Sequence, residues 1–382
     1  MNNFVFQSPT LIRFGEGEIA NLAQHIPPQA KVLLTYGGGS IFQNGVYDQV
    51  KAALVGHQVG EFGDIEPNPR YPTLMKAVEL IRNEGYDYLL AVGGGSVLDG
   101  TKFIAAAVCF EGTDPWQILS QDAPVKAALP LASVLTLPAT GSETNGAAVV
   151  TRGEDKLSFY SDLVKPQFAV LDPTTTYSLP PRQVANGIVD AFVHVMEQYL
   201  TTGGAPVQDR FAEGVMLTLI EEGPKALAQP TSYEARANLM WAATMALNGI
   251  LGVGVPQDWS THALGHELTA RFGLDHGRTL AVVLPALLRV RKDAKGAKLL
   301  QFAERVFAIT EGDNEARIEA GIAAMEAFFR SLEMGTRLRD YDLDETVVDG
   351  LVGALERKGM TALGEDGGVS LEVSRAVFNA AL

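Results

Sequence analysis

The chain has 382 residues, enough for two domains, and its hydrophobic fraction of 47% and charged fraction of 20% are ordinary for a globular protein. Its formal net charge is −15 with no run of basic residues, which argues against nucleic acid and anionic membranes as partners. The single cysteine, Cys109, excludes an internal disulfide. No signal sequence and no apolar run of membrane-spanning length are recognisable, so we expect a cytoplasmic protein.

The first half alternates short apolar runs with amphipathic ones. We predict buried strands over 31–36, 86–92, 133–137 and 168–171. Helical patterns fill the gaps, for example over 71–83 and 97–110. Strands that alternate with helices form right-handed crossovers, so residues 1–180 are predicted to be an α/β domain with a parallel sheet. Near the start of this domain, Phe4–Phe6 and Leu11–Phe14 are candidates for a small hairpin.

Small residues follow three of the predicted strands. Two strands end in Gly-Gly-Gly-Ser, at 37–40 and 93–96, and a third leads into Thr140-Gly-Ser-Glu143. Glycine removes the side chain that would block an anion, and a helix N-terminus offers free N–H groups. Ser96 is the expected N-cap of the next helix. Either glycine run could instead simply make a tight turn, and neither matches the Gly-x-Gly-x-x-Gly fingerprint. Three such turns at one sheet edge favour a long, phosphate-bearing cofactor.

After Leu179-Pro-Pro181 the pattern changes to long helical periods. We predict helices near 182–200, 207–227, 232–250, 257–271, 278–292, 294–309, 314–332 and 345–357. Residues 181–382 are therefore predicted to be an all-α domain. A boundary near residue 180 would place its first helix beside an interdomain cleft, a favoured position for ligands.

Four of the six histidines and one aspartate fall in two segments with metal-ligand spacing. These are Asp190-x-x-x-His194 and His262-x-x-x-His266, with His276 ten residues further on. Residues four apart on a helix share one face, and imidazole with carboxylate suits zinc, iron or manganese. A lone histidine on an apolar helix is usually a core residue, but four clustered histidines are harder to explain in that way. Spacing leaves open which histidines bind and which one carries protons.

Several motifs occur together along the whole chain. They are Ile65-Glu-Pro-Asn-Pro69, Gly93-Gly-Gly-Ser-Val-Leu-Asp99, Leu137-Pro-Ala-Thr-Gly-Ser-Glu143, and the two histidine segments. With this combination the chain resembles the iron-containing alcohol dehydrogenases. Within that family it is most similar to the bacterial NADPH-dependent, broad-substrate aldehyde reductases, through Pro180–Asn186 and Gly254–Trp259. The resemblance implies a dehydroquinate synthase-like fold, with an α/β dinucleotide domain followed by a helical metal domain.

The resemblance also implies the site residues. It assigns one divalent metal, Fe²⁺ or Zn²⁺, to four ligands, Asp190, His194, His262 and His276. It leaves His266 off the metal and near the nicotinamide, where an imidazole could pass the catalytic proton. Around NADP(H) it implies Gly38, Gly39, Ser40, Asn68, Gly94, Gly95, Ser96, Asp99, Thr136, Thr140, Ser142, Lys156, Leu179 and His266, with the pyrophosphate over Gly94, Gly95 and Ser96.

The first glycine turn predicts the cofactor. NAD-dependent members of the family typically carry an aspartate after the first strand, whereas Gly37–Ser40 contains no acid. A carboxylate there would repel a 2′-phosphate, while small residues and free N–H groups would admit it. We therefore predict NADPH over NADH. Thr175 stands where close relatives can carry a bulkier side chain, which could reshape the pocket.

The expected activity is metal-dependent, NADPH-linked reduction of small, uncharged aldehydes to primary alcohols by a homodimer. One alternative is an NAD-dependent polyol or glycerol dehydrogenase, and another is a non-enzymatic metal- or nucleotide-binding protein. A third is a dehydroquinate synthase-like lyase. That lyase would need a different ligand set beginning with glutamate and a basic pocket, whereas Ala191, Phe192 and Val195 make this region apolar.

Overall fold

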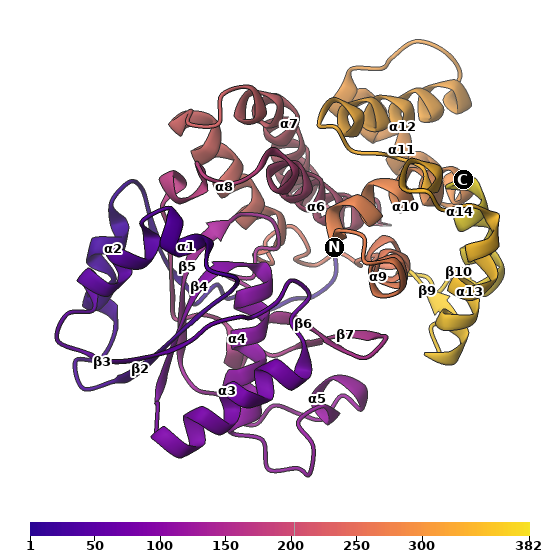
Figure 1. Cartoon of the computed structure of the whole chain (residues 1–382). Coiled ribbons are helices and arrows are strands. Elements are labelled where there is room, and N and C mark those ends of the chain that lie inside the picture. Colours follow the sequence, from indigo (N-terminus) through magenta and orange to yellow (C-terminus); the bar gives the residue numbers. More distant parts are fainter. Residues whose placement is uncertain (202) are drawn as a thin grey trace. The chain divides into compact units, whose positions relative to one another are not determined.

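The computed structural model describes residues 1–201 and 203–382, and the chain divides into two compact units (Figure 1). The α/β unit comprises Gln7–Leu179 and Pro230–Thr244. The helical unit comprises Met1–Phe6, Pro180–Gln229 and Met245–Leu382. The division therefore differs from the simple boundary expected at residue 180, because the first six residues belong to the helical unit and a later segment returns to the α/β unit.

A six-stranded parallel sheet forms the centre of the α/β unit, with strand order β1-β8-β5-β4-β2-β3. The strands are β1 (Leu11–Phe14), β2 (Lys31–Tyr36), β3 (Gln58–Phe62), β4 (Tyr88–Gly94), β5 (Leu131–Leu137) and β8 (Phe168–Leu171). The parallel α/β architecture predicted from the alternating pattern is confirmed. The strand β3 was not predicted, and its exposed first residue and half-buried remainder explain the weak apolar signal.

Helices cover both faces of this sheet. Successive side chains of a strand point to opposite faces. Leu33 accordingly packs with α3 (Tyr71–Glu84) and α4 (Gly95–Val108), while Leu34 packs with η1 (Glu18–His25) and α2 (Val46–Ala53). The unit also contains the short helices α1 (Ser40–Gln43), α5 (Gln117–Ser120), η2 (Asp162–Val164) and η3 (Pro173–Thr176), and most of α8 (Tyr233–Leu247).

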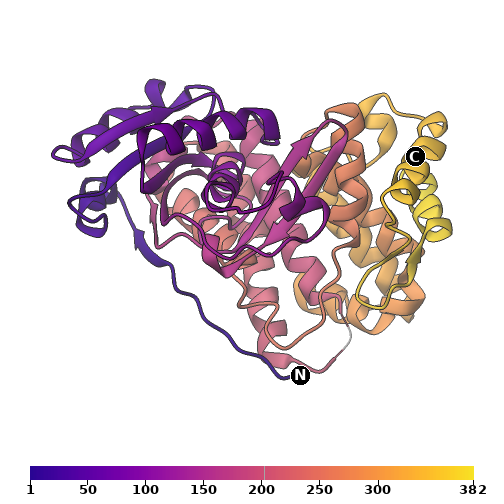
Figure 2. The same ribbon diagram turned by 90° about the horizontal axis from the view of Figure 1, so that it is seen from below.

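The hairpin expected near the N-terminus is wrong. Residues 4–6 form no strand and follow an extended path (Figure 2), while β1 pairs in parallel with β8, Leu11 opposite Phe168. An isolated two-stranded hairpin is marginal, whereas the edge of an existing sheet satisfies a full row of backbone groups. The hairpin that does form was not predicted: β6 (Ala147–Arg152) pairs antiparallel with β7 (Asp155–Tyr160).

The helical unit contains seven of the eight helices expected from periodicity, with shifted ends; the eighth, expected near 232–250, is α8, most of which belongs to the α/β unit. The seven are α6 (Pro181–Tyr199), α7 (Pro206–Ala228), α9 (Ser260–Phe272), α10 (His276–Val290), α11 (Lys292–Phe307), α12 (Asn314–Ser331) and α13 (Val348–Arg357). The unit also contains α14 (Leu371–Ala380), which was not predicted, with η4 (Leu338–Tyr341) and η5 (Glu345–Val347). Its core joins Leu264 and Leu268 of α9 to Val283 of α10 and Phe378 of α14. A two-stranded ladder, β9 (Ala362–Leu363) with β10 (Val369–Ser370), makes the unit mostly helical where an all-α domain was expected.

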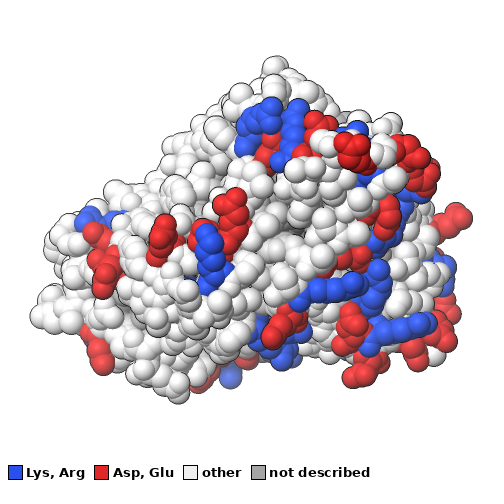
Figure 3. Space-filling view, turned by 90° about the horizontal axis from the view of Figure 1, so that it is seen from above, with Lys and Arg blue, Asp and Glu red and all other residues white. Residues whose placement is uncertain are grey.

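Two surface properties bear on partners. On the face seen in Figure 3, lysine and arginine side chains are interspersed with aspartates and glutamates and form no continuous basic area. Within the described ranges 1–201 and 203–382, no helix is both long and apolar enough to cross a membrane.

Candidate metal centre and glycine-rich turns

The helix α6 carries two of the expected ligands on one buried face. Most of α6 is enclosed, with Val189, Phe192 and Val193 fully buried. Asp190 and His194, one turn apart, are 3% and 4% exposed. A buried carboxylate needs partners of opposite charge or a metal ion, since leaving it alone in an apolar interior is very costly. The other histidines come from α9, which carries His262, and from α10, which begins at His276.

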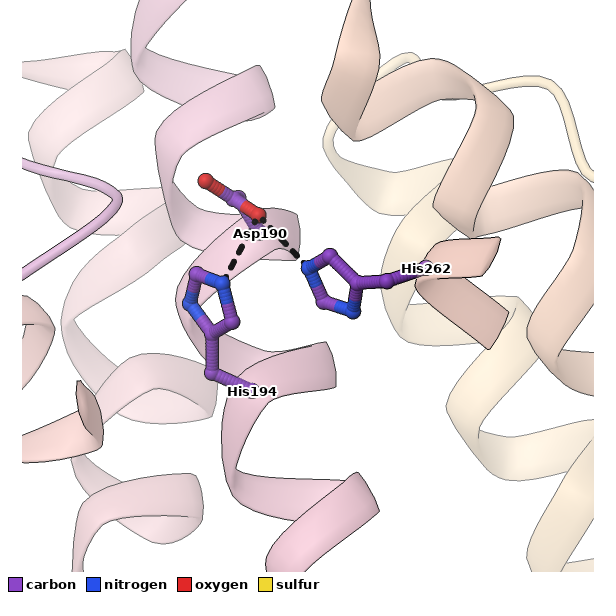
Figure 4. A group of neighbouring side chains, drawn as sticks. All are labelled: Asp190, His194 and His262. Atoms are coloured by element: carbon purple, nitrogen blue, oxygen red, sulfur yellow. Dashed lines mark ion pairs between the residues drawn. The ribbon is translucent and has the colours of Figure 1, made fainter. Parts of the chain in front are cut away.

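Asp190 Oδ1 lies at nearly equal distances from three imidazoles. It is 3.5 Å from His194 Nε2, 3.6 Å from His262 Nε2 and 3.5 Å from His276 Nε2. Figure 4 shows Asp190, His194 and His262 converging from α6 and α9. A tetrahedral ion with bonds of about 2.0–2.2 Å separates its ligand atoms by about 3.3–3.6 Å. The three distances therefore match the edges of a four-ligand cation site.

Two of these atoms also have no hydrogen bond that would explain their burial, among the described residues. Asp190 Oδ1 and His262 Nε2 are buried and, among the described residues, have no hydrogen-bond partner. The ligand atoms of Asp190, His194 and His262 all lie within 4.8 Å of one another. Three imidazoles and one carboxylate are a donor set that accepts iron or zinc. The residues present therefore fit a bound divalent metal.

The cluster perturbs the pKa of its members. Burial by itself would raise the pKa of Asp190, but the imidazoles of His194, His276 and His262 lower it below the ordinary value. Burial would lower the pKa of His262, yet the carboxylates of Glu197 and Asp190 raise it to about 9. The buried carboxylates thus favour protonated imidazoles beside them. A metal cation can take the place of these protons when it binds to the imidazole nitrogens.

His266 lies beside the cluster. Its ring centroid is 5.3 Å from that of His276 and 6.4 Å from that of His262. The ion pairs of Asp190 in the structure are with the other three histidines. Trp259 closes another side, with its indole edge-on to His194 and His262 at centroid distances of 6.3 and 5.5 Å. His266 therefore lies next to the rings of His262 and His276.

The side chains become more exposed toward His276. The side chain of His194 is 5% exposed, that of His262 12% and that of His276 24%. The turn before His276 is held by Asp275, whose Oδ2 accepts from Arg182 Nε at 2.6 Å and from Asn186 Nδ2 at 2.7 Å. A Cβ on Gly277 would lie 2.5 Å from the carbonyl oxygen of Asn186, so this glycine lets α10 begin against α6.

Glu197 was missed in the sequence analysis. It is 3% exposed, and its two carboxylate oxygens accept hydrogen bonds from the backbone N–H of His262, at 3.1 Å, and from His262 Nδ1. Burial raises the pKa of Glu197, while His262 acts to lower it. Its position three residues after His194 and seven after Asp190 puts it on the same helix face, a signal that the spacing Asp-x-x-x-His-x-x-Glu contains.

The glycine-rich turns follow three neighbouring strands. Tyr36 at the end of β2 is paired with Val92 of β4, and Gly94 at the end of β4 is paired with Leu137 of β5. Because the strands are parallel, the turns that follow them lie at one sheet edge. The second and third turns are in close contact: a Cβ on Gly95 would lie 2.6 Å from the side chain of Thr140. Packing alone therefore requires glycine at position 95, independently of any bound cofactor.

Side chains around the second turn are connected by hydrogen bonds. Asp99 accepts from Ser142 Oγ at 2.7 Å and from the N–H of Val149 at 3.0 Å, and burial raises its pKa. The Ser96 hydroxyl accepts from the N–H of Asn68 at 3.2 Å. The expected N-cap at Ser96 is wrong, because α4 already begins at Gly95 with Gly94 as its N-cap. The helix therefore starts two residues earlier than expected and has Gly95 and Ser96 in its first turn.

Lys102 is a second residue that sequence reasoning missed. It is fully buried one turn after Asp99, and its ammonium group donates to Asn145 Oδ1 at 3.1 Å and to the carbonyl of Ala147 at 2.9 Å. Asn145 in turn donates to the carbonyl of Thr140 at 3.1 Å. Burial lowers the pKa of Lys102 to about 8 against the opposing effect of nearby carboxylates. Lys102 thus supports the third turn from inside the unit.

The first turn is more open. Gly38 has no atom within 4 Å of the place where a Cβ would be, while Gly39 has a left-handed φ of 92°. Ser40 begins the short helix α1.

Four other residues named from the sequence lie in the α/β unit. Thr136 is buried near the end of β5, Lys156 is buried on β7, and Leu179 is the last residue of the unit's first segment. The hydroxyl of Thr175 donates to the carbonyls of Leu135 at 3.0 Å and Asp172 at 2.8 Å, which gives this threonine a role in the fold.

Comparisons with known proteins agree with this geometry. Residues 9–173 match the profile of the iron-containing alcohol dehydrogenase family, and residues 184–360 match that of the C-terminal part of the Fe-containing alcohol dehydrogenase family. The chain is 59% identical to the NADPH-dependent aldehyde reductase YqhD of Escherichia coli K12, over 100% of both chains. The crystal structure of E. coli K-12 YqhD has a TM-score of 0.98 and is covered to 99%, with 100% of this chain aligned.

Two other relatives are named for NADH dependence. The chain is 41% identical to the probable NADH-dependent butanol dehydrogenase 1 of Bacillus subtilis, over 91% of this chain and 92% of the relative. The crystal structure of NADH-dependent butanol dehydrogenase A from Thermotoga maritima has a TM-score of 0.96 at 35% identity, covering 100% of this chain and 99% of that one.

Proposed function

Because the chain belongs to the iron-containing alcohol dehydrogenase family, we propose that it reduces aldehydes to primary alcohols with NADPH and one divalent metal ion. The observation that carries this proposal is the equal spacing of Asp190 Oδ1 from three imidazole Nε2 atoms. The NADPH dependence of the relative at 59% identity supports the choice of cofactor, as does the first turn, which lacks an acidic residue.

The proposed ligands are Asp190, His194, His262 and His276. A cation held by them would supply Lewis-acid polarisation of the aldehyde carbonyl, and bound NADPH would supply the hydride to its carbon. Asp190 contributes a negative charge as well as a donor atom, so the buried site carries less net positive charge. His276, the most exposed of the four, marks the side from which a small uncharged substrate would enter.

His266 is proposed to complete the reaction by proton transfer. Aldehyde, hydride and one proton together give the alcohol, so a group near the reacting oxygen must supply that proton. An imidazole titrates close to working pH, and the ring of His266 lies beside those of His276 and His262. The transfer can be direct or through a water molecule.

The glycine-rich turns are proposed to bind the dinucleotide. The first turn of α4, with Gly95 and Ser96, offers backbone N–H groups and the positive end of a 14-residue helix for the pyrophosphate. Gly38, Gly39 and Ser40 are proposed to admit the 2′-phosphate. Around them we propose Asn68, Gly94, Asp99, Thr136, Thr140, Ser142, Lys156 and Leu179 as further cofactor-binding residues.

The test combines metal analysis with a cofactor screen. Purified protein is analysed for iron and zinc, and the oxidation of NADPH and NADH is followed over a panel of short aldehydes. We expect close to one divalent metal per chain and faster turnover with NADPH. Bound metal without oxidation of either cofactor by any aldehyde would contradict the proposal. A clear preference for NADH would favour the alternative of an NAD-dependent polyol or glycerol dehydrogenase.

The proposal extends to the metal, the oligomeric state and the location. The donor set accepts Fe²⁺ or Zn²⁺ equally well, so the proposal includes both. A homodimer is proposed from the family resemblance, and sedimentation of the purified protein would test it. A cytoplasmic location stays a prediction from the sequence.

A further inference from the structure

Glu197 of α6 contacts the proposed ligand His262 of α9. The side chain of Glu197 is only 2% exposed. One oxygen accepts from Nδ1 of the His262 ring, the nitrogen that faces away from Asp190. The other oxygen accepts from the backbone N–H of His262 at 3.1 Å. The whole carboxylate is therefore committed to a single residue.

These contacts fix His262 in two ways. His262 is the third residue of α9, so its backbone N–H is one of the four at a helix start that have no partner inside the helix. A carboxylate at this end also interacts favourably with the helix dipole. On the ring, an acceptor at Nδ1 selects the tautomer with its proton there, which leaves the lone pair of Nε2 available to a metal ion bound beside Asp190 Oδ1.

The backbone around Glu197 reinforces this arrangement. The carbonyl oxygen of Glu197 accepts from the N–H of Asp258 at 2.9 Å, and the Asp258 side chain accepts from the N–H of Ser260 at 2.8 Å. Asp258 itself is paired with the buried ammonium group of Lys295 at 2.8 Å. The start of α9 is thus tied to α6 at Glu197, and the charge of Asp258 is already compensated.

Charge gives Glu197 a further role. A divalent cation with Asp190 as its only anionic ligand would leave a net positive charge in a buried site, which is costly. The carboxylate of Glu197, one imidazole away, would compensate it. We propose that Glu197 is a positioning residue of the metal centre, which orients His262 and neutralises the remaining charge of the bound ion. This inference rests on the proposed metal site.

The test measures metal affinity without cofactor or substrate. Metal-stripped protein is titrated with Zn²⁺ against a chromogenic chelator, and the visible spectrum of the Co²⁺-loaded form reports the ligand geometry. The variants are Glu197→Ala, which removes the carboxylate, and Glu197→Gln, which keeps an acceptor for Nδ1–H without the charge. The matched control is Glu326→Gln, a buried glutamate of α12 paired with Arg289 and Arg337.

We expect Glu197→Ala to raise the Kd for Zn²⁺ by about 10- to 100-fold and to alter the Co²⁺ spectrum, as is usual for a lost partner of a ligating histidine. Glu197→Gln should fall between Ala and wild type, and Glu326→Gln should leave the Kd unchanged. If Glu197→Ala does not fold, the Glu197→Gln comparison decides alone. Wild-type affinity and spectrum in the Glu197 variants, or an equal loss in the control, would overturn the inference. Failure of the wild type to bind Zn²⁺, Co²⁺ or Fe²⁺ would instead contradict the proposed function.

Discussion

The two candidate sites of this chain are built in opposite ways. In the helical unit, the candidate metal centre consists of side-chain atoms, and those of Asp190, His194 and His262 are buried and lie within 4.8 Å of one another. In the α/β unit, the glycine-rich turns offer backbone groups, and packing leaves no room for side chains at some of their glycines. A Cβ on Gly94, for example, would lie 2.9 Å from Leu137. Mutations should therefore damage the first site by removing atoms and the second by adding them.

The largest expected effect is the loss of a ligand. His262→Ala and His276→Ala should each lose bound metal and turnover together, because the loss of one of four protein ligands weakens binding of the ion and lets a chelator remove it. His266→Ala is the matched control, and it should lose activity but retain metal. Elemental analysis with NADPH oxidation rates measures both. Metal loss in His266→Ala would show that the ligand set is assigned wrongly.

The next effect concerns the buried charges behind the metal centre. Lys295 contacts Asp258, Glu365 and the carbonyl of Leu200, and all three charged side chains are 5–7% exposed. Lys295→Met leaves two buried carboxylates uncompensated and should lower the free energy of unfolding by about 3–5 kcal/mol. Lys292→Met on the same helix breaks an exposed pair with Glu315 and should cost far less, because water screens this pair. Urea unfolding measures both, and equal costs would contradict this reading.

In the α/β unit, the buried Lys102 should make the free energy of unfolding depend on pH. Its pKa is lowered from 10.5 to about 8 by burial, so between these values the unfolded chain binds more protons than the folded one. Stability conferred by this residue must then rise as pH increases from 8 to 10, by about 2 kcal/mol. The difference in unfolding free energy between wild type and Lys102→Met should show this rise, while that for the exposed Lys126→Met should not. A flat difference would mean that Lys102 stays charged.

The smallest effect is a change of cofactor preference. Gly38 has room for a side chain and no left-handed backbone, so it can be replaced without strain. Gly38→Asp should raise the KM for NADPH by roughly tenfold, because a carboxylate repels the 2′-phosphate, and should change the KM for NADH little. Gly38→Asn has the same size without the charge and should leave both near wild type. An equal rise for both cofactors would contradict the assignment of this turn.

The two regions also differed in how far sequence predicted them. Spacing of four residues on a helix brought Asp190 together with His194, and only the family resemblance set His266 apart from the other three histidines. The supporting groups were missed because their partners are distant in the chain: Glu197 acts on His262 across 65 positions and Lys102 on Asn145 across 43. The prediction of an N-terminal hairpin was wrong for the same reason, because β1 pairs with β8, which is distant in the sequence.

The central claim is that one metal ion is held by Asp190, His194, His262 and His276. Anomalous diffraction from crystals of the metal-loaded protein, recorded on both sides of the iron and zinc absorption edges, tests it most directly. We expect one peak at about 2.0–2.3 Å from Asp190 Oδ1 and from the Nε2 atoms of the three histidines, with His266 farther away. A peak within bonding distance of His266 would contradict the claim. So would the absence of a peak at this position in crystals of protein that is fully active.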